Sequence, residues 1–213
     1  MKTSDLIDML SADVEVVDRR MVLRAVAAAL AAGTGISICA VLVALGVRAD
    51  LDRPQAVVFV VGKLVFTLGI VVLAVIFLVK LARPVGERYR PMGVVLLPFV
   101  IIVGLGVLSP PSVPGAQGET MIAGEHCREC WLIVPAIAMV PFALVIRALR
   151  RGAPTHLIEA GALVGLIAGG IGAMAYALHC ISDSMPFVVL WCAGTIALCT
   201  LAGAVLGPRL LRW

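Results

Sequence analysis

Cysteine and histidine residues in two short segments are the side chains of this chain best suited to chemistry. His126–Cys130 contains two cysteines with CxxC spacing, and His179–Cys180 adds a second cluster later in the sequence. Thiols and imidazoles grouped in this way can form a disulfide or bind a soft metal ion. The predicted sensing residues are Cys130 and Cys180, both possible transient metal ligands, with Cys127, His126 and His179 as further candidates.

Three uses of these residues remain open. The first is reversible sensing, by thiol oxidation or by metal ligation. The second is a four-ligand zinc site, although the second CxxC pair typical of such sites is missing. The third is a structural disulfide, or buried cysteines without a signalling role. The other cysteines, Cys39, Cys192 and Cys199, lie inside apolar runs and are predicted to be packing residues.

The elements that position these cysteines follow from the composition. The chain has 213 residues, of which 62% are hydrophobic and 14% charged, and its mean hydropathy is +1.09. This is too little polar surface for a soluble globule, and the apolar runs are long enough to cross a bilayer as helices. The predicted fold is therefore all-α: a polytopic bundle of six transmembrane helices, with an N-terminal cytoplasmic amphipathic helix. The predicted spans are approximately residues 23–46, 57–81, 92–108, 131–149, 157–180 and 186–206.

Basic residues between the spans predict the orientation. Thirteen Lys and Arg residues fall on one side of the predicted membrane and only Arg48, Arg53 and Arg128 on the other, leaving Lys63 near the start of the second span. Because basic short loops stay in the cytoplasm, both termini are predicted there. In a bacterial inner membrane the candidate cysteines then face the oxidising periplasm. This distribution explains the net charge of +4 without direct nucleic-acid binding.

Residues 1–20 are predicted to be a cytoplasmic segment distinct from the transmembrane domain, residues 21–213. Apolar residues recur there at helical spacing, with acidic residues largely on the other side. Anionic lipid repels such an acidic helix, so a groove on a protein partner is expected. The alternative is that the helix packs on the cytoplasmic end of the bundle. The candidate contact residues are Asp5, Leu6, Ile7, Leu10, Val14 and Val17.

Glycines predict one close helix contact. Gly161, Gly165 and Gly169 have four-residue spacing, which leaves one face of a helix almost without side chains, and Gly203 and Gly207 repeat the spacing in the last span. The sequence contains no GxSxG, Walker loop or HExxH motif. It therefore predicts neither an enzyme nor a cofactor.

Several segments together resemble the negative regulator of sigma F family of six-span bacterial anti-sigma factors. They are residues 150–155 (RRGAPT), 160–162 (AGA), 176–180 (YALHC), Trp191 and 210–213 (LLRW), with 1–3 (MKT) and 5–7 (DLI) at the N-terminus. The resemblance covers nearly the whole chain, although residues 85–124 match only in hydropathy.

This resemblance implies an anti-sigma factor of the bacterial inner membrane. Such a protein sequesters an extracytoplasmic-function sigma factor and releases it when heavy-metal or oxidative stress is sensed in the periplasm. The family's periplasmic cysteine pair matches Cys130 and Cys180, whereas Cys127 is an addition. The competing prediction is a small thiol-based redox or metal-handling membrane protein, such as a transporter. That function needs a polar path through the membrane, and no charged residue is predicted clearly in the middle of a span.

Overall fold

The computed structural model describes residues 19–48, 54–81, 93, 100, 104, 126–150, 152, 156–180 and 192–212. This part of the chain is helical and contains no strand. Five of its helices are long and apolar enough to cross a membrane, which supports an all-α membrane protein. They are α2 (Arg19–Ala44), α3 (Pro54–Leu81), α6 (His126–Leu149), α7 (Leu157–Ala177) and α9 (Ala193–Leu210).

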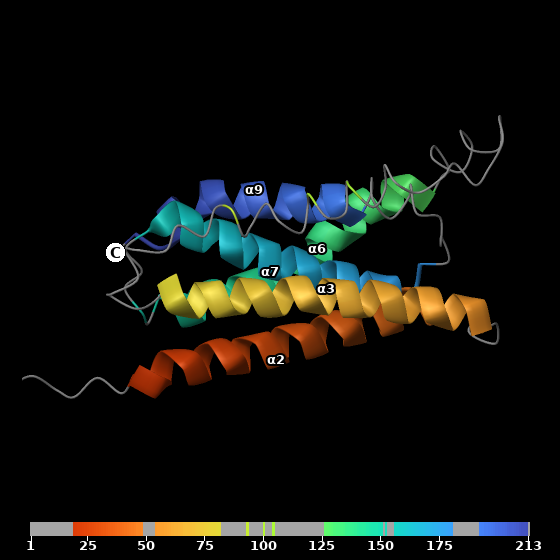
Figure 1. Ribbon diagram of the computed structural model, residues 1–213, viewed down its shortest axis with the longest axis horizontal. Helices are drawn as coiled ribbons and strands as arrows, with labels where there is room; N and C mark the ends of the chain where they lie inside the picture. Colours follow the sequence, from red (N-terminus) through yellow and green to blue (C-terminus); the bar gives the residue numbers. More distant parts are fainter. Residues whose placement is uncertain are drawn as a thin grey trace, which may run out of the picture.

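Helix α7 lies at the centre of the bundle, and the other four helices all contact it (Figure 1). Most of its residues are buried, including Leu163, Ile167 and Ile171. By contrast, α2 and α3 expose many large apolar side chains. Outward-facing apolar surface of this kind suits acyl chains rather than water.

Contacts between the helices fix their directions. Gly161 lies against Gly207 and Gly169 against Ile196, so α7 and α9 are antiparallel. The backbone of Arg48, just after α2, bonds to Leu178, just after α7, so these two helices end on the same side. Figure 1 shows α2 and α7 running in one direction and α3, α6 and α9 in the other.

The two ends of the bundle differ in composition. We call the side on which α2 and α7 end the cysteine end, after Cys180. The opposite side is the basic end, and it carries Arg24, Lys80, Arg147, Arg150 and Arg209. Helix α3 ends at the basic end, and α6 begins at the cysteine end.

Two predicted elements fall outside the described residues. Of the third span, residues 92–108, the structure describes only positions 93, 100 and 104, each of them helical. The amphipathic helix predicted within residues 1–20 precedes the described part, apart from the first two residues of α2.

The predicted span 131–149 agrees with the apolar part of α6, Trp131–Leu149, although the helix itself begins at His126 and therefore includes the CxxC segment. Three other predicted spans have different boundaries in the structure. The first, predicted at residues 23–46, is Met21–Ala44. Helix α9 occupies Ala193–Leu210 instead of residues 186–206, and it extends further because the Leu211 N–H still bonds to the Gly207 carbonyl.

The end of α7 is the third difference. The prediction continued the helix to Cys180, but α7 ends at Ala177. The Leu178 N–H bonds to Ala175, and the N–H groups of His179 and Cys180 both bond to Tyr176, which makes a tight final turn. Hydropathy could not show this end because residues 178–180 are not polar enough to interrupt the apolar run.

The contact between α7 and α9 brings backbone against backbone. A methyl group added at Gly207 would lie 2.8 Å from the Gly161 Cα, and one added at Gly203 would lie 2.9 Å from the Gly165 Cα. At Gly169 it would lie 2.9 Å from the Cys199 Cβ. These distances are shorter than van der Waals contact, so the helices can approach this closely only because glycine has no side chain.

Candidate functional site

Cys180 lies at the cysteine end, directly after the final turn of α7. Cys180 is only 9% exposed and belongs to the main hydrophobic core. The side chain of Arg48 comes from the segment after α2, and its Nη1 donates to the Cys180 carbonyl oxygen over 3.1 Å. Cys180, which was predicted to meet the periplasm, is therefore packed inside the protein at the cysteine end.

The segment after α2 reaches Cys180 because of how that helix ends. The N–H groups of Leu45 and Gly46 both bond to the Val41 carbonyl, and Gly46 adopts a φ of +78°. This left-handed conformation suits glycine and commonly terminates a helix. The chain then turns so that the backbone N–H of Arg48 donates to the Leu178 carbonyl over 3.2 Å.

His179 makes a further connection to the same segment. Its Nδ1 lies 3.2 Å from the Gly46 carbonyl oxygen, which can only accept, so Nδ1 carries the hydrogen in this bond. A backbone carbonyl bonded to one ring nitrogen fixes the tautomer and leaves the other nitrogen able to bind a metal. The ring also contacts Tyr176, with 6.0 Å between centroids. His179 is thus oriented as a metal ligand would be, next to Cys180.

The other predicted sensing residues belong to the beginning of α6. His126, Cys127 and Cys130 lie in the first turns of that helix, and their side chains are outside the described part of the structure. Since α6 and α7 are antiparallel, the start of α6 shares the cysteine end with Cys180. Cys127 and Cys130 are three positions apart and His126 and Cys130 four, a spacing that puts these positions on one stripe of the helix.

The described side chains do not by themselves form a complete metal site. Among the residues with described side chains, no three His, Cys, Asp or Glu residues are grouped as metal ligands. A metal at Cys180 and His179 would therefore need further ligands from elsewhere, and the first turns of α6 are the candidates that the sequence offers. The four-ligand zinc alternative depends on that same segment.

The sequence did not suggest that Arg48 and Cys192 lie close to Cys180 at the cysteine end. Arg48 was one of three basic residues assigned to the outer side, yet it is only 4% exposed. Cys192, assigned to interior packing, lies near enough to Cys180 and Lys63 to interact electrostatically with both. Its position just before α9, at the cysteine end, is the signal that could have drawn attention to it.

The remaining cysteines, Cys39 and Cys199, lie within helices α2 and α9. Cys39 is exposed on α2, and Cys199 is buried where α9 meets Gly165 and Gly169. Both are free thiols in the structure.

The predicted partner-binding residues precede the described part of the chain. The contact residues of the N-terminal segment, Asp5 to Val17, lie outside the described residues, which begin at Arg19. Near the basic end, Arg150 Nε donates to the Leu210 carbonyl over 2.6 Å and joins α6 to the end of α9. Lys80 lies over the Phe77 ring, 5.4 Å from its centroid.

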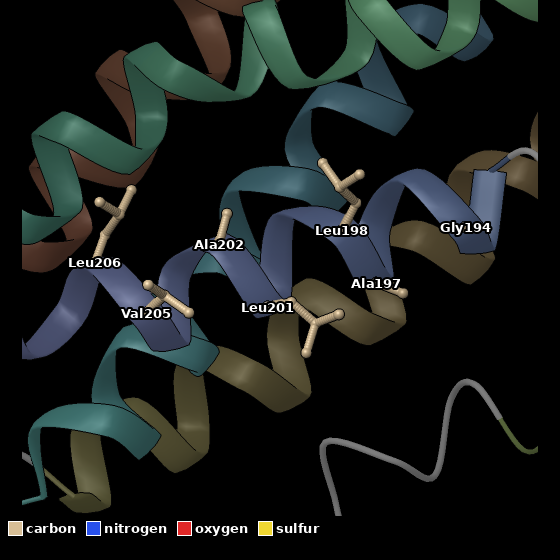
Figure 2. Close-up of a pocket in the computed structure, with 7 residues that line it drawn as sticks. All are labelled: Gly194, Ala197, Leu198, Leu201, Ala202, Val205 and Leu206. Carbon is tan, nitrogen blue, oxygen red and sulfur yellow. The ribbon is translucent and has the colours of Figure 1, made fainter.

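A shallow groove of about 560 Å³ follows the outer surface of α9. Figure 2 shows Leu198 and Leu206 on one side of the helix and Leu201 on another. The lining residues are Gly194, Ala197, Leu198, Leu201, Ala202, Val205 and Leu206. Because these side chains are all apolar, the groove offers nothing to a metal ion or a polar ligand, and the cysteine end remains the candidate site.

Comparison with known proteins assigns the chain to a family. Residues 10–213 match the family described as "Negative regulator of sigma F". A protein of Azospira oryzae named "Probable anti-sigma-F factor NrsF" is 26% identical over 213 residues. A protein of Caulobacter vibrioides named "Anti-sigma-F factor NrsF" is 33% identical over 224 residues, and both alignments cover 100% of each chain. No solved structure matches this chain. The match over residues 10–213 and these two full-length relatives show that the chain belongs to the negative regulator of sigma F family, whose description is regulatory rather than enzymatic.

Proposed function

We propose that this chain is an anti-sigma factor of the bacterial inner membrane. Residues 1–20 hold an extracytoplasmic-function sigma factor at the cytoplasmic face, and heavy-metal or oxidative stress acting on Cys130 and Cys180 in the periplasm releases it. The observation that carries this proposal is the family match over residues 10–213, which includes all five long described helices. The names of the two relatives describe anti-sigma-F factors, and we extend that activity to this chain.

The charge distribution supports the proposed orientation. Several exposed basic residues cluster at the basic end, whereas Arg48, the described arginine at the cysteine end, is buried. Basic residues are retained on the cytoplasmic side, so the cysteine end is periplasmic in this proposal. The passage of the chain from the end of α3 to the start of α6 adds one more crossing, and residues 92–108 are the apolar run available for it. Six spans keep both termini in the cytoplasm.

Burial of Cys180 gives the proposed sensing step a physical basis. Its sulfur is part of a packed core, and protein cores have little free volume for an added group. A soft cation bound by the two thiols displaces their two protons, and disulfide formation transfers two electrons and two protons to an oxidant. Either change alters the packing at the end of α7, so the two chemical states favour different arrangements of the helices.

The proposed sigma contact is tested by replacing Leu10 with aspartate. A charge on the apolar face opposes burial in a hydrophobic groove, and loss of one central contact costs about 2 kcal/mol or more, roughly a 30-fold loss of affinity. We expect the sigma factor to co-purify with the wild-type chain and with Leu10→Ile, but not with Leu10→Asp or a chain lacking residues 1–20. Undiminished binding by Leu10→Asp would refute this contact.

The proposed sensing role is tested at the two cysteines. Cys130→Ser and Cys180→Ser are each expected to fix expression of the sigma-dependent genes in one state, with or without Cd²⁺ or peroxide. Cys39→Ser is the matched control because Cys39 is an exposed free thiol on α2 and is not one of the predicted sensing residues. Transcript levels of the target genes give the measurement, and a normal response in both test variants would exclude the cysteine pair.

A further inference from the structure

Residues 178–180, which end at Cys180, are joined to the end of α2 by three hydrogen bonds. The Arg48 N–H donates to Leu178 and the Arg48 Nη1 to Cys180, over 3.2 and 3.1 Å. His179 Nδ1 donates in the opposite direction to Gly46, over 3.2 Å. Three consecutive residues after α7 are therefore held by one short segment after α2.

These hydrogen bonds are largely shielded from water. Arg48 is 4% exposed and Cys180 is 9% exposed, so water competes little for their polar groups. Hydrogen bonds that involve a charged donor are shorter and stronger than neutral ones, particularly at low local dielectric. The Gly46 carbonyl is available to His179 only because the left-handed Gly46 turns the chain out of the helix. A shift of Cys180 or His179 must therefore either break these bonds or move the end of α2.

Helix α2 connects this junction to the opposite side of the membrane. It contains 26 residues without an internal proline, which corresponds to a length of about 39 Å. Its first described residue, Arg19, lies two positions after Val17, the last of the residues proposed to contact the sigma factor. By contrast, α6 contains Pro135 and Pro141, and α7 is held against α9 through backbone contacts. Helix α2 is the direct and uninterrupted route between the two sites.

We infer that Arg48 and His179 are positioning residues that couple the chemical state of Cys180 to α2, so that α2 carries the signal to the cytoplasmic N-terminal segment. A ligand or modification at Cys180 displaces residues 178–180, and the three bonds transmit this displacement to Gly46–Arg48. This inference rests on the proposed function only for what the movement controls. Whether Cys180 is coupled to α2 can be tested without any sigma factor.

The test measures hydrogen–deuterium exchange in the full-length chain in lipid nanodiscs, before and after addition of Cd²⁺ or, for the oxidative route, hydrogen peroxide. For the wild-type chain we expect exchange in peptides covering residues 1–26 to change about fivefold or more, the low end of ordinary allosteric coupling. Arg48→Leu removes the side-chain donor, and we expect its response to fall below about 1.5-fold, which is almost no coupling. Arg48→Lys is the matched control because it keeps a charged donor.

A second pair of variants tests the other side chain and remains informative if Arg48→Leu does not fold. His179→Phe keeps an aromatic ring beside Tyr176 but has no donor for the Gly46 carbonyl. His179→Asn restores an N–H near the position of Nδ1. We expect the response of residues 1–26 to be lost in the phenylalanine variant and recovered in the asparagine variant. A merely structural role would lower the stability of His179→Phe without making the response depend on the restored donor.

The outcomes separate this inference from the proposed function. A full response in both Arg48→Leu and His179→Phe would overturn the inference, and so would a wild-type chain whose residues 1–26 respond to neither reagent, even if it binds and releases a sigma factor. A wild-type response that is lost in these variants would support the inference even if no sigma factor binds. In that case the proposed function fails and the route through α2 stands.

Discussion

Helices α9 and α2 are both neighbours of the central helix α7, but they are attached to it in different ways. Helix α9 meets α7 along a line of glycines, where backbone lies against backbone at Gly161, Gly165 and Gly169. Helix α2 exposes most of its middle residues and is joined to the chain after α7 by hydrogen bonds at Arg48 and Gly46. The first contact leaves no room for sliding, whereas the hydrogen bonds join only one end of α2 to α7, and the rest of α2 packs mainly against α6.

This difference indicates which part of the bundle can move. Closely packed helices have few alternative arrangements, so α7 and α9 are expected to behave as one body. A helix that is hydrogen-bonded to the α7 region at one end can change its position when that end is displaced, and the exposed apolar side of α2 leaves it room to shift outward. In a regulator that must connect two sides of a membrane, the tight pair would then serve as the frame and α2 as the moving part.

The largest expected effect comes from adding one methyl group to the frame. In Gly165→Ala the new Cβ would meet the Cys199 carbonyl oxygen and lie 3.0 Å from the Thr200 Cα, both parts of the backbone. The helices must separate, and overpacking of this kind costs about 3 kcal/mol. We expect the midpoint of thermal unfolding in detergent to fall by roughly 6–12 °C.

Gly69→Ala in α3 is the control for this change, since nothing lies within 4 Å of its added Cβ. Its stability should stay within about 0.5 kcal/mol of wild type. Equal unfolding midpoints for Gly165→Ala and wild type would show that α7 and α9 are not locked together, and the contrast with α2 would disappear.

A smaller effect is expected where α2 packs against α6. In Gly33→Ala the new Cβ would lie 2.9 Å from the Pro141 Cβ and 3.0 Å from its Cα. Because α2 can shift outward toward lipid, we expect a cost of about 1–2 kcal/mol, at the lower part of the overpacking range. The same thermal measurement checks this, with Gly35→Ala as the control on the same helix, where the added Cβ has open space. A loss as large as that of Gly165→Ala would mean that α2 is held as rigidly as α9.

The sequence could predict the parts of this comparison that depend on composition. Hydropathy located five helices because each apolar run is long enough to cross the membrane. The spacing of Gly161, Gly165 and Gly169 predicted a face that allows close approach, and the structure puts α9 there. These features depend on one segment at a time, so one sequence contains enough information for them.

The contacts at the cysteine end could not be predicted in this way. The burial of Arg48 depends on the carbonyls of residues 178–180, which lie far away in the sequence. The final turn of α7 is similarly decided by backbone hydrogen bonds that hydropathy does not describe. The sequence therefore marked Cys180 as chemically interesting but could not show that it is buried or which helix holds it.

The smallest predicted effect concerns buried hydroxyl groups and has opposite signs in the two regions. Near α7, Thr200 Oγ1 donates to the Ile196 carbonyl over 2.8 Å, so Thr200→Val should cost about 0.5–1 kcal/mol. In α2, Ser37 is 1% exposed and its Oγ has no hydrogen-bond partner within the described part of the chain. Removing a buried, unsatisfied hydroxyl relieves its desolvation penalty, so Ser37→Ala should raise stability by about 1 kcal/mol or slightly less.

Thermal unfolding of Thr200→Val and Ser37→Ala under identical conditions shows whether their changes in stability have opposite signs. A frame selected for a single arrangement should have its polar groups satisfied, as Thr200 has. A moving helix can keep an unsatisfied group such as Ser37 if a second arrangement of α2 provides a partner for it. Stabilisation by Ser37→Ala together with a weaker Cd²⁺ response would fit that explanation. Destabilisation equal to that of Thr200→Val would show instead that Ser37 contributes to the packing of this arrangement, and it would remove this difference between α2 and the frame.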